Sequence, residues 1–370
     1  MNKRMIFKRI SIVLILLISG FALSSFTTDD KPGESPAPRV KNIILMIGDG
    51  MGITQVSAAM TIRNNSLNMT TTKHIGFTTT HSADDYITDS AASGTAMATG
   101  TKTRNNILGM SADTTSLVPI TQLARDQKKM SYGVVSTSAV THATPAAFVT
   151  QNVSRSDYEG IAMDFVRKQP DVFIGGGKAN FTNRRDQRDL VKVLEQDGYE
   201  VAFTMEDLYM AKADKVAGLL ADVHMPRYSE GRAYMLAEST DKAIQLLSRN
   251  KRGFFLMIEG SQIDWGGHAN DAQYVLEELY DFDVAVGVAL QFAAHDKNTL
   301  VIVTSDHETG GMTLDWGSME DNSVIAKFSS TTHTGVVVPV FAFGAGAEHF
   351  TGFYDNTGLF ERMKAALRLR

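Results

Sequence analysis

The chain has 370 residues, of which 43% are hydrophobic and 21% charged, as is typical of a globular protein. Its 36 basic and 41 acidic residues give a formal charge of −5, and the acidic body argues against a nucleic-acid-binding protein. The complete lack of cysteine excludes disulfide scaffolds, thiol catalysis and cysteine-ligated zinc.

The first 24 residues are predicted to form a secretory signal peptide. Four basic residues precede an apolar run over residues 10–23, and the small residues Ser24 and Ser25 follow it. The alternative is a membrane anchor, but this run is shorter than the roughly 20 residues that span a bilayer. We therefore expect cleavage, no stable membrane anchor, and export to the periplasm or the medium. Residues 25–38 would be a disordered leader and residues 39–370 one domain.

Short apolar runs, several of them rich in β-branched residues, predict strands that are buried on both faces of a parallel sheet. They are Val40–Ile47, Tyr132–Val135, Val172–Ile174, Gly253–Ile258, Leu300–Val303 and Val336–Phe343. Segments with helical spacing, such as 271–294, lie between them. This alternation predicts an α/β fold, a three-layer sandwich with helices on both faces of a large, mostly parallel sheet. Residues 205–232 are predicted to be an irregular surface excursion.

Three of these strands run directly into carboxylates and imidazoles. Asp49 follows the first strand, Glu259 to His268 follow the fourth, and Asp306 with His307 follows the fifth. In open α/β sheets, ligands bind beyond the carboxyl ends of the strands. Taken alone, Asp49 between two glycines could equally well be a plain turn residue. Three such motifs at one sheet edge instead indicate a metal site.

Asp264 and His268 stand four residues apart, which places both on one face of a helix. Taken alone, the pair would more often be a solvated helix face than a pair of metal ligands.

The segment 88–96, TDSAASGTA, predicts a helix N-terminus with Asp89 or Ser90 as its cap. This is compatible with a tightly packed helix start. It is also where backbone amides bind a phosphate, and a serine there needs a metal or a base to become a nucleophile.

These motifs resemble those of the alkaline phosphatase family. The matching segments are GDGMG, TDSAASGTA, HATPAAF, IEGSQIDWGGHAND, VTSDHETGG and THTG, in the family's order. The resemblance implies that residues 39–370 form the catalytic domain of an enzyme that hydrolyses phosphate monoesters to an alcohol and inorganic phosphate at alkaline pH. It also implies a homodimer, two zinc ions and one magnesium ion per subunit. The implied ligands are Asp264, His268 and His333 for the first zinc, Asp49, Asp306, His307 and Ser90 for the second, and Asp49, Thr144 and Glu259 for the magnesium.

The resemblance also implies the roles of two further side chains and reveals two departures. Ser90 matches the nucleophile that becomes phosphorylated, and Arg155 matches the guanidinium that binds two phosphate oxygens. His142 stands where the enterobacterial pattern has an aspartate, and Trp265 stands where it has a lysine. This combination is similar to that of marine and cold-adapted bacterial members, and it puts magnesium at the third site in doubt.

Related activities remain as alternatives. A sulfatase needs a modified residue in a C/S-x-P-x-R segment, which Ser90–Gly94 lacks. Phosphodiesterases of the superfamily usually carry a threonine nucleophile and no arginine clamp, so Ser90 with Arg155 favours monoesters. A non-catalytic exported protein that binds phosphate or metal would be expected to lack some catalytic positions, and none is missing.

Overall fold

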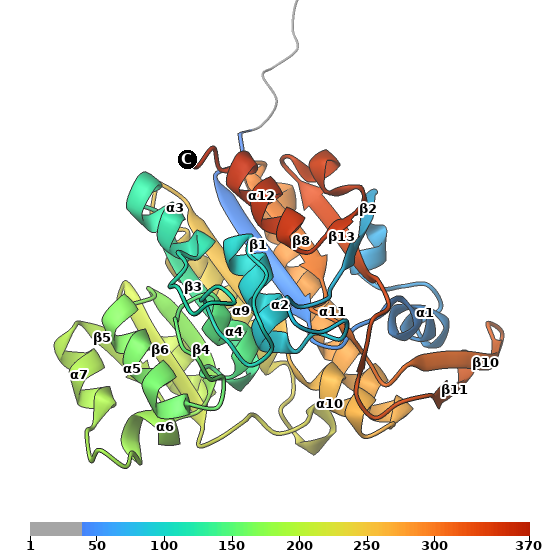
Figure 1. Ribbon diagram of the computed structural model, residues 1–370, viewed down its shortest axis with the longest axis horizontal. Coiled ribbons are helices and arrows are strands. Elements are labelled where there is room, and N and C mark those ends of the chain that lie inside the picture. The colour runs from blue at the N-terminus through green and yellow to red at the C-terminus, as the bar shows by residue number, and fades with distance from the viewer. Residues whose placement is uncertain (1–38) are drawn as a thin grey trace, which may run out of the picture. The chain divides into compact units, whose positions relative to one another are not determined.

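The computed structural model describes residues 39–370. The predicted signal peptide and leader, residues 1–38, lie outside the described residues. Ten strands form one large sheet at the centre of the fold (Figure 1). In spatial order they are β14 (Gly352–Asp355), β2 (His74–Thr79), β13 (Val338–Gly344), β8 (Thr299–Thr304), β1 (Asn42–Gly48), β7 (Phe254–Gly260), β3 (Ser131–Ala139), β4 (Val172–Gly176), β6 (Lys215–Ala221) and β5 (Tyr199–Ala202).

The sheet is mostly parallel, as predicted, and all six predicted strands are present. Strands β8, β1, β7, β3, β4, β6 and β5 pair in parallel, whereas β13 runs antiparallel to β8 and β2. Every residue of β1 is buried. Because successive side chains of a strand point to opposite faces, Ile43 and Leu45 pack in one apolar layer and Ile44 and Met46 in the other.

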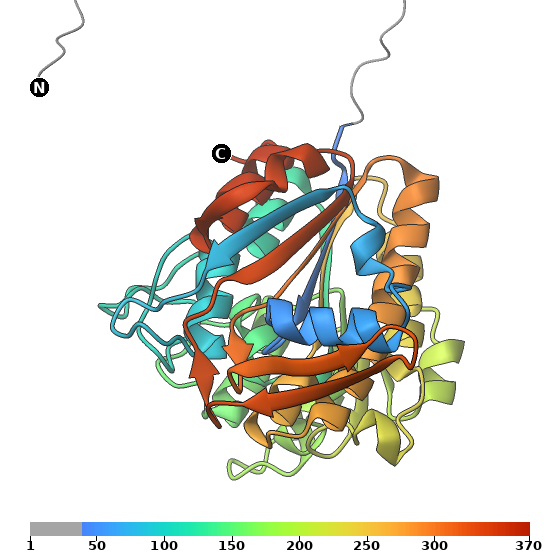
Figure 2. The same ribbon diagram turned by 90° about the vertical axis from the view of Figure 1, so that its right-hand side faces the viewer.

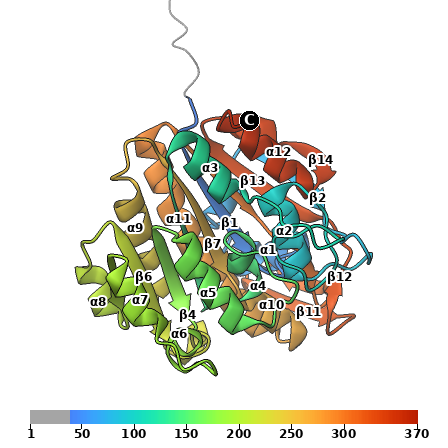
Figure 3. The same cartoon turned by 60° about the vertical axis from the view of Figure 1, so that its left-hand side comes forward.

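Helices cover both faces of the sheet, which confirms the three-layer sandwich (Figure 1 and Figure 3). One layer holds α2 (Ser90–Thr99), α3 (Ile120–Lys128), α4 (Ala143–Ala147), α5 (Tyr158–Lys168), α6 (Ala179–Thr182), α7 (Leu190–Gln196) and α12 (Thr357–Ala366). The other holds α1 (Ile53–Ile62), α8 (Met205–Met210), α9 (Met235–Leu247), α10 (Gln262–His268) and α11 (Ala272–Asp296).

The predicted helix over 271–294 is α11, whose N-terminus is capped by the side chain of Asp271.

Two small antiparallel pairs lie outside the main sheet. Strands β10 (Met312–Ser318) and β11 (Ser323–Phe328) form a hairpin that packs beside α1 (Figure 2). Strands β9 (Glu308–Thr309) and β12 (His333–Thr334) pair so that His333 lies opposite Thr309. The second pair brings a late histidine back to the carboxyl end of β8. Within residues 39–370, no helix is both long and apolar enough to cross a bilayer.

The prediction of an irregular excursion over residues 205–232 is wrong for most of that segment. It contains α8 and β6, and β6 is an internal strand between β4 and β5. The signal was weak because the sequence of β6, KVAGLLA, includes two alanines and a glycine, which have low β propensity. The irregular parts are residues 211–214, between α8 and β6, and the stretch after β6, which contains only the short 3-10 turn η2 (Tyr228–Glu230).

Candidate active site

The predicted site residues lie at the carboxyl edge of three neighbouring strands. Because β1 pairs in parallel with both β7 and β8, the segments that follow these strands emerge side by side. Asp49 follows β1, Glu259 lies near the end of β7, and Asp306 follows β8. All three carboxylates are fully buried. The parallel register therefore gathers acidic side chains that lie up to 257 positions apart in the sequence.

Helix α2 brings the predicted nucleophile to this edge. Asp89 is the N-cap, and its carboxylate accepts a hydrogen bond from the backbone N–H of Ala92. Ser90 is the first helical residue and is buried, with its Oγ 3.3 Å from Nε2 of His307. The hydroxyl therefore lies at a helix N-terminus and against the cluster of potential ligands.

Asp264, His268 and His333 form one group that could hold a metal ion, with ligand atoms all within 4.8 Å of one another. Helix α10 places Asp264 and His268 one turn apart, as the sequence predicts. Nε2 of His268 lies 3.3 Å from Oδ1 of Asp264 and 3.2 Å from Nε2 of His333. Three ligand atoms thus converge on one point.

The two histidines of this group are oriented by the backbone. Nδ1 of His268 lies 2.7 Å from the carbonyl oxygen of Thr331, and Nδ1 of His333 lies 2.8 Å from that of Thr88. A carbonyl only accepts, so each Nδ1 carries the hydrogen that it donates, and each Nε2 faces the other ligand atoms of the group. This arrangement is typical of metal-ligating histidines.

His307 is the centre of a second group. Its Nε2 lies 3.1 Å from Oδ2 of Asp306 and 3.5 Å from Oδ1 of Asp49. Asp306 is itself held by its Oδ1, which accepts hydrogen bonds from the backbone N–H groups of Gly50 and His307. Asp49, Asp264 and His307 also satisfy the distance requirement for a shared metal. The two groups are therefore adjacent and share carboxylates.

A third group consists of Asp49, Glu259 and His142, again with ligand atoms within 4.8 Å. The hydroxyl of Thr144 lies 3.4 Å from Oδ2 of Asp49, so Thr144 belongs to the same corner. Ser138 and Ser261 donate hydrogen bonds to Oε2 of Glu259. Asp49 thus lies between the second and third groups.

The buried oxygens of this cluster fit divalent cations. Oδ1 of Asp49, Oε1 of Glu259 and Oδ2 of Asp306 are buried and have no hydrogen-bond partner. Burial together with the charges of neighbouring carboxylates raises the pKa of Asp49 well above its usual range and that of Glu259 to about 7. Such a concentration of buried negative charge is costly unless cations compensate it.

Arg155 lies at the rim of the cluster. Its Nη1 makes a 3.0 Å ion pair with Asp89, and its Nη2 lies 3.5 Å from Nε2 of His142. Burial and the charge of Arg155 lower the pKa of His142 to about 3, so this imidazole is neutral. The structure therefore brings all twelve predicted site residues to one edge of the sheet, with Trp265 beside His142 at a ring-centroid distance of 6.3 Å.

Sequence reasoning missed several residues that contact the site. Asp89 was assigned only as a possible helix cap, yet it also holds Arg155. Thr309 donates a hydrogen bond to Asp264 and lies 3.2 Å from Nδ1 of His307. The ring of His224 packs against Trp265 and His142. The segment of His224 carries no motif that would have indicated this position.

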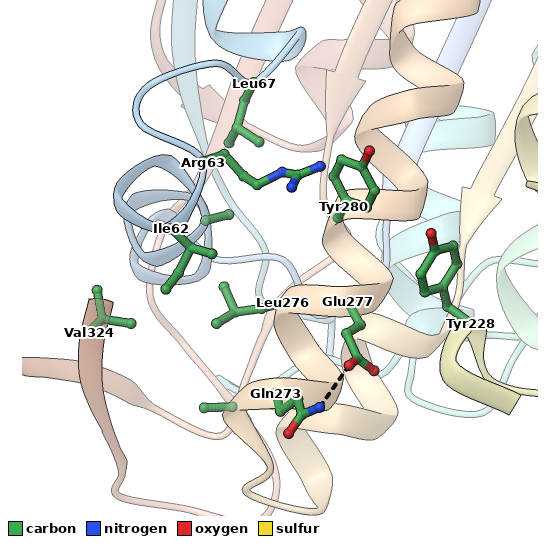
Figure 4. Close-up of a pocket in the computed structure, with 11 residues that line it drawn as sticks. Ile62, Arg63, Leu67, Tyr228, Gln273, Leu276, Glu277, Tyr280 and Val324 are labelled. Carbon is green, nitrogen blue, oxygen red and sulfur yellow. Dashed lines mark hydrogen bonds between the residues drawn. The ribbon is translucent and has the colours of Figure 1, made fainter. Parts of the chain in front are cut away.

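A separate pocket of about 460 Å³ lies between α1 and α11 (Figure 4). Its wall is mainly apolar. Arg63 stacks on Tyr280, with its Cζ 3.6 Å from the centroid of the ring. None of the predicted site residues lines this pocket.

Comparison with known proteins shows the family to which this chain belongs. The family model described as alkaline phosphatase matches residues 40–327. Alkaline phosphatase 4 of Bacillus subtilis is 34% identical, with 94% of each chain covered. Streptomycin-6-phosphate phosphatase of Streptomyces griseus is 33% identical, with 96% of each covered.

Among solved structures, the alkaline phosphatase of the Antarctic bacterium TAB5 superimposes with a TM-score of 0.85 at 40% identity, covering 90% of this chain and 99% of that one. A cold-active alkaline phosphatase from a psychrophilic Shewanella gives a TM-score of 0.79 at 31% identity, covering 88% and 99%. With its sheet, its carboxylate and imidazole cluster and its helix-borne serine, this chain belongs to the alkaline phosphatase family.

Proposed function

We propose that this enzyme hydrolyses phosphate monoesters through a phosphoserine intermediate on Ser90. The observation that carries the proposal is the position of the Ser90 hydroxyl, at the N-terminus of α2 and 3.3 Å from His307. Ser90 Oγ would bond to phosphorus as the bond from phosphorus to the alcohol oxygen breaks. Water would then displace Ser90 Oγ and release inorganic phosphate. Two inversions at phosphorus give overall retention of configuration.

The proposed cofactors are two zinc ions and one magnesium ion per subunit. Asp264, His268 and His333 would hold one zinc. The second would lie among Asp49, Asp306, His307 and Ser90, and magnesium would lie among Asp49, Thr144 and Glu259. When bound, such ions lower the pKa of hydroxyl and water ligands and stabilise a departing alkoxide. The donor set of carboxylate and imidazole is the one that zinc accepts, and the three unpartnered buried oxygens support it.

The chain's own residues would bind and orient the phosphate. Arg155 presents a planar fork that suits two phosphate oxygens, and its ion pair with Asp89 holds the fork at the mouth of the cluster. The first backbone N–H groups of α2 and the helix dipole favour the same anion. These groups recognise the phosphate rather than the alcohol.

His142 and Trp265 are proposed to make this enzyme similar in its active site to the cold-adapted bacterial type. Two solved variants of the TAB5 enzyme, with Asp or Glu in place of a histidine, carry magnesium in the M3 site. Neither His142 nor Trp265 adds a positive charge near the phosphate, since the imidazole is neutral. Product should therefore leave readily. Few prolines, 8 in 370 residues, agree with cold adaptation.

Export and dimer formation complete the proposal. The basic residues and the apolar run of the first 24 residues support export to the periplasm or the medium. A homodimer is proposed from the family resemblance. Sedimentation velocity of the mature chain would test it, and a monomer at micromolar concentration would contradict it.

The experiment that tests the function compares p-nitrophenyl phosphate, bis-p-nitrophenyl phosphate and p-nitrophenyl sulfate at alkaline pH. Each is assayed before chelation, after chelation, and after zinc and magnesium are restored. We expect hydrolysis of the monoester that chelation abolishes and the metals rescue. Preference for the diester would overturn the role of Arg155, and activity on the sulfate alone would overturn the phosphate assignment.

A further inference from the structure

The segment 222–234, which joins β6 to α9, brings His224 to the rim of the candidate active site. Nδ1 of His224 accepts a 3.0 Å hydrogen bond from the backbone N–H of Ala139, at the end of β3. Because Nδ1 accepts, the neutral ring carries its hydrogen on Nε2. The orientation of His224 is therefore defined by the backbone of a central strand.

Three aromatic rings meet here, and we call His142, His224 and Trp265 the aromatic triad. The ring of His224 stands edge-on to Trp265, at 4.9 Å and 77°, and edge-on to His142, at 5.6 Å and 88°. His142 and Trp265 also meet edge-on, at 6.3 Å and 87°. Edge-to-face contacts at these distances are attractive and directional. Each ring thus limits the rotation of the other two.

The segment that carries His224 is fixed to its surroundings on three sides. Gln262 of α10 donates a 2.8 Å hydrogen bond to the carbonyl of Met225. Arg232 is buried in ion pairs with Glu278 and Asp281 of α11.

The third side is the end of β4. A Cβ on Gly176 would lie 2.3 Å from the carbonyl oxygen of Val223, so only glycine allows this approach. Tyr228 of the same segment lies beside α11 (Figure 4), where its N–H donates to Glu278.

The triad is continuous with the proposed phosphate clamp. Nε2 of His142 lies 3.5 Å from Nη2 of Arg155, whereas Nδ1 of His142 is buried and has no hydrogen-bond partner. The position of the His142 ring therefore depends on packing, and His224 supplies one side of that packing. A shift of His142 or Trp265 would change the space that Arg155 and the phosphate occupy.

We propose that His224 is a positioning residue that holds Trp265 and His142 in place and so sets the affinity of the site for phosphate. The inference rests on the proposed role of Arg155 in binding phosphate. His224 does not touch the reacting atoms and acts only through the other two rings. Its loss should therefore change KM and product inhibition more than kcat.

Trp265 allows a direct test, because the chain has two tryptophans and the other, Trp316, is 55% exposed on β10. In a Trp316→Phe background, the fluorescence and acrylamide quenching of Trp265 report on its packing, with or without metals. His224→Asn keeps an acceptor for the N–H of Ala139 but removes the ring. His224→Phe keeps the ring but removes the acceptor. His349→Asn, at an exposed histidine, is the matched control.

We expect His224→Asn to increase the quenching of Trp265 and to raise KM and the inhibition constant of inorganic phosphate about 2- to 10-fold, the equivalent of one aromatic contact, with kcat changed less. His224→Phe should restore the shielding of Trp265 and most of the phosphate affinity. Wild-type quenching and inhibition in His224→Asn would overturn the inference, as would equal changes in His349→Asn. Quenching in the metal-depleted protein tests the packing even if the wild type proves inactive on monoesters.

Discussion

The carboxyl ends of β1, β7 and β8 and the segment 222–234 both reach the active site, but different interactions hold them there. The strand ends are placed by parallel hydrogen bonding within the sheet, so Asp49, Glu259 and Asp306 follow from the register. Segment 222–234 has almost no regular structure. It is held by the ion pairs of the buried Arg232, by the side-chain amide of Gln262 and by the ring of His224. A wall of the site can therefore be placed without regular secondary structure, by a small number of tertiary contacts.

The largest expected effect concerns Ser90, which α2 places against the potential ligands at the strand ends. Ser90→Ala removes the hydroxyl that would accept the phosphoryl group but leaves the surrounding ligands in place. We expect the turnover of p-nitrophenyl phosphate to fall roughly 1,000-fold or more, with no phosphate retained on the protein after acid quenching. Turnover within tenfold of the wild type would show that another group accepts the phosphoryl.

A second prediction breaks the anchor of segment 222–234. Arg232→Leu leaves Glu278 and Asp281 buried without their shared cation, which should destabilise the protein by about 3–5 kcal/mol. Urea unfolding measures this. Arg185→Leu is the control, because Arg185 is 86% exposed and its pair with Glu159 should contribute less than about 1 kcal/mol. Equal decreases in the free energy of unfolding of the two variants would show that the buried ion pairs of Arg232 stabilise the protein no more than the exposed pair of Arg185 does.

A third prediction concerns the contact between Asp89 and Arg155. Asp89→Ala removes both the cap of α2 and the carboxylate that holds the guanidinium, so kcat/KM should fall about 10- to 100-fold. Asp157→Ala is the matched control, since Asp157 caps α5 and makes no ion pair with Arg155. It should lose about 1 kcal/mol of stability and little activity. A similar loss of kcat/KM in both variants would assign the effect to capping alone.

The smallest expected effect concerns Trp265, in the uncharged aromatic triad at the rim of the active site. Trp265→Lys introduces a cation near the proposed phosphate position, which should tighten inhibition by inorganic phosphate about 3- to 10-fold. Competitive inhibition assays at constant ionic strength measure this. Inhibition equal to that of the wild type would show that position 265 does not face the phosphate.

Much of the fold could be predicted because its signals are local. Six strands are apolar runs, and α11 shows its helical period and its Asp271 cap. Asp49, Glu259 to His268, and Asp306 with His307 were predicted from motifs at strand ends, where one rule of α/β architecture brings distant positions together. Thr144, Arg155 and His333 were predicted only from the family resemblance. The backbone carbonyls that accept hydrogen bonds from Nδ1 of His268 and His333 could not be predicted, because a backbone carbonyl leaves no signal in the sequence.

Strand β6 and His224 were missed for a different physical reason. The alanines and glycine of β6 have low β propensity, and the strand forms because β4 and β5 pair with it on both sides. His224 lies in a stretch whose position is set by residues of α10, α11 and β4. Tertiary contacts alone place both, and a single sequence does not display them.

The pairing of β1 has a consequence for how the protein matures. Ile43 lies beside Phe255 and Leu300, so the first strand has no sheet partners until more than 200 further residues have been synthesised. Contacts of such long sequence separation form slowly, because closing a large loop costs conformational entropy before the contacts can stabilise the chain. His333 comes later still, so a chain truncated before it would lack a complete active site. Phosphatase activity therefore reports that the polypeptide has been made at least as far as His333 and has folded.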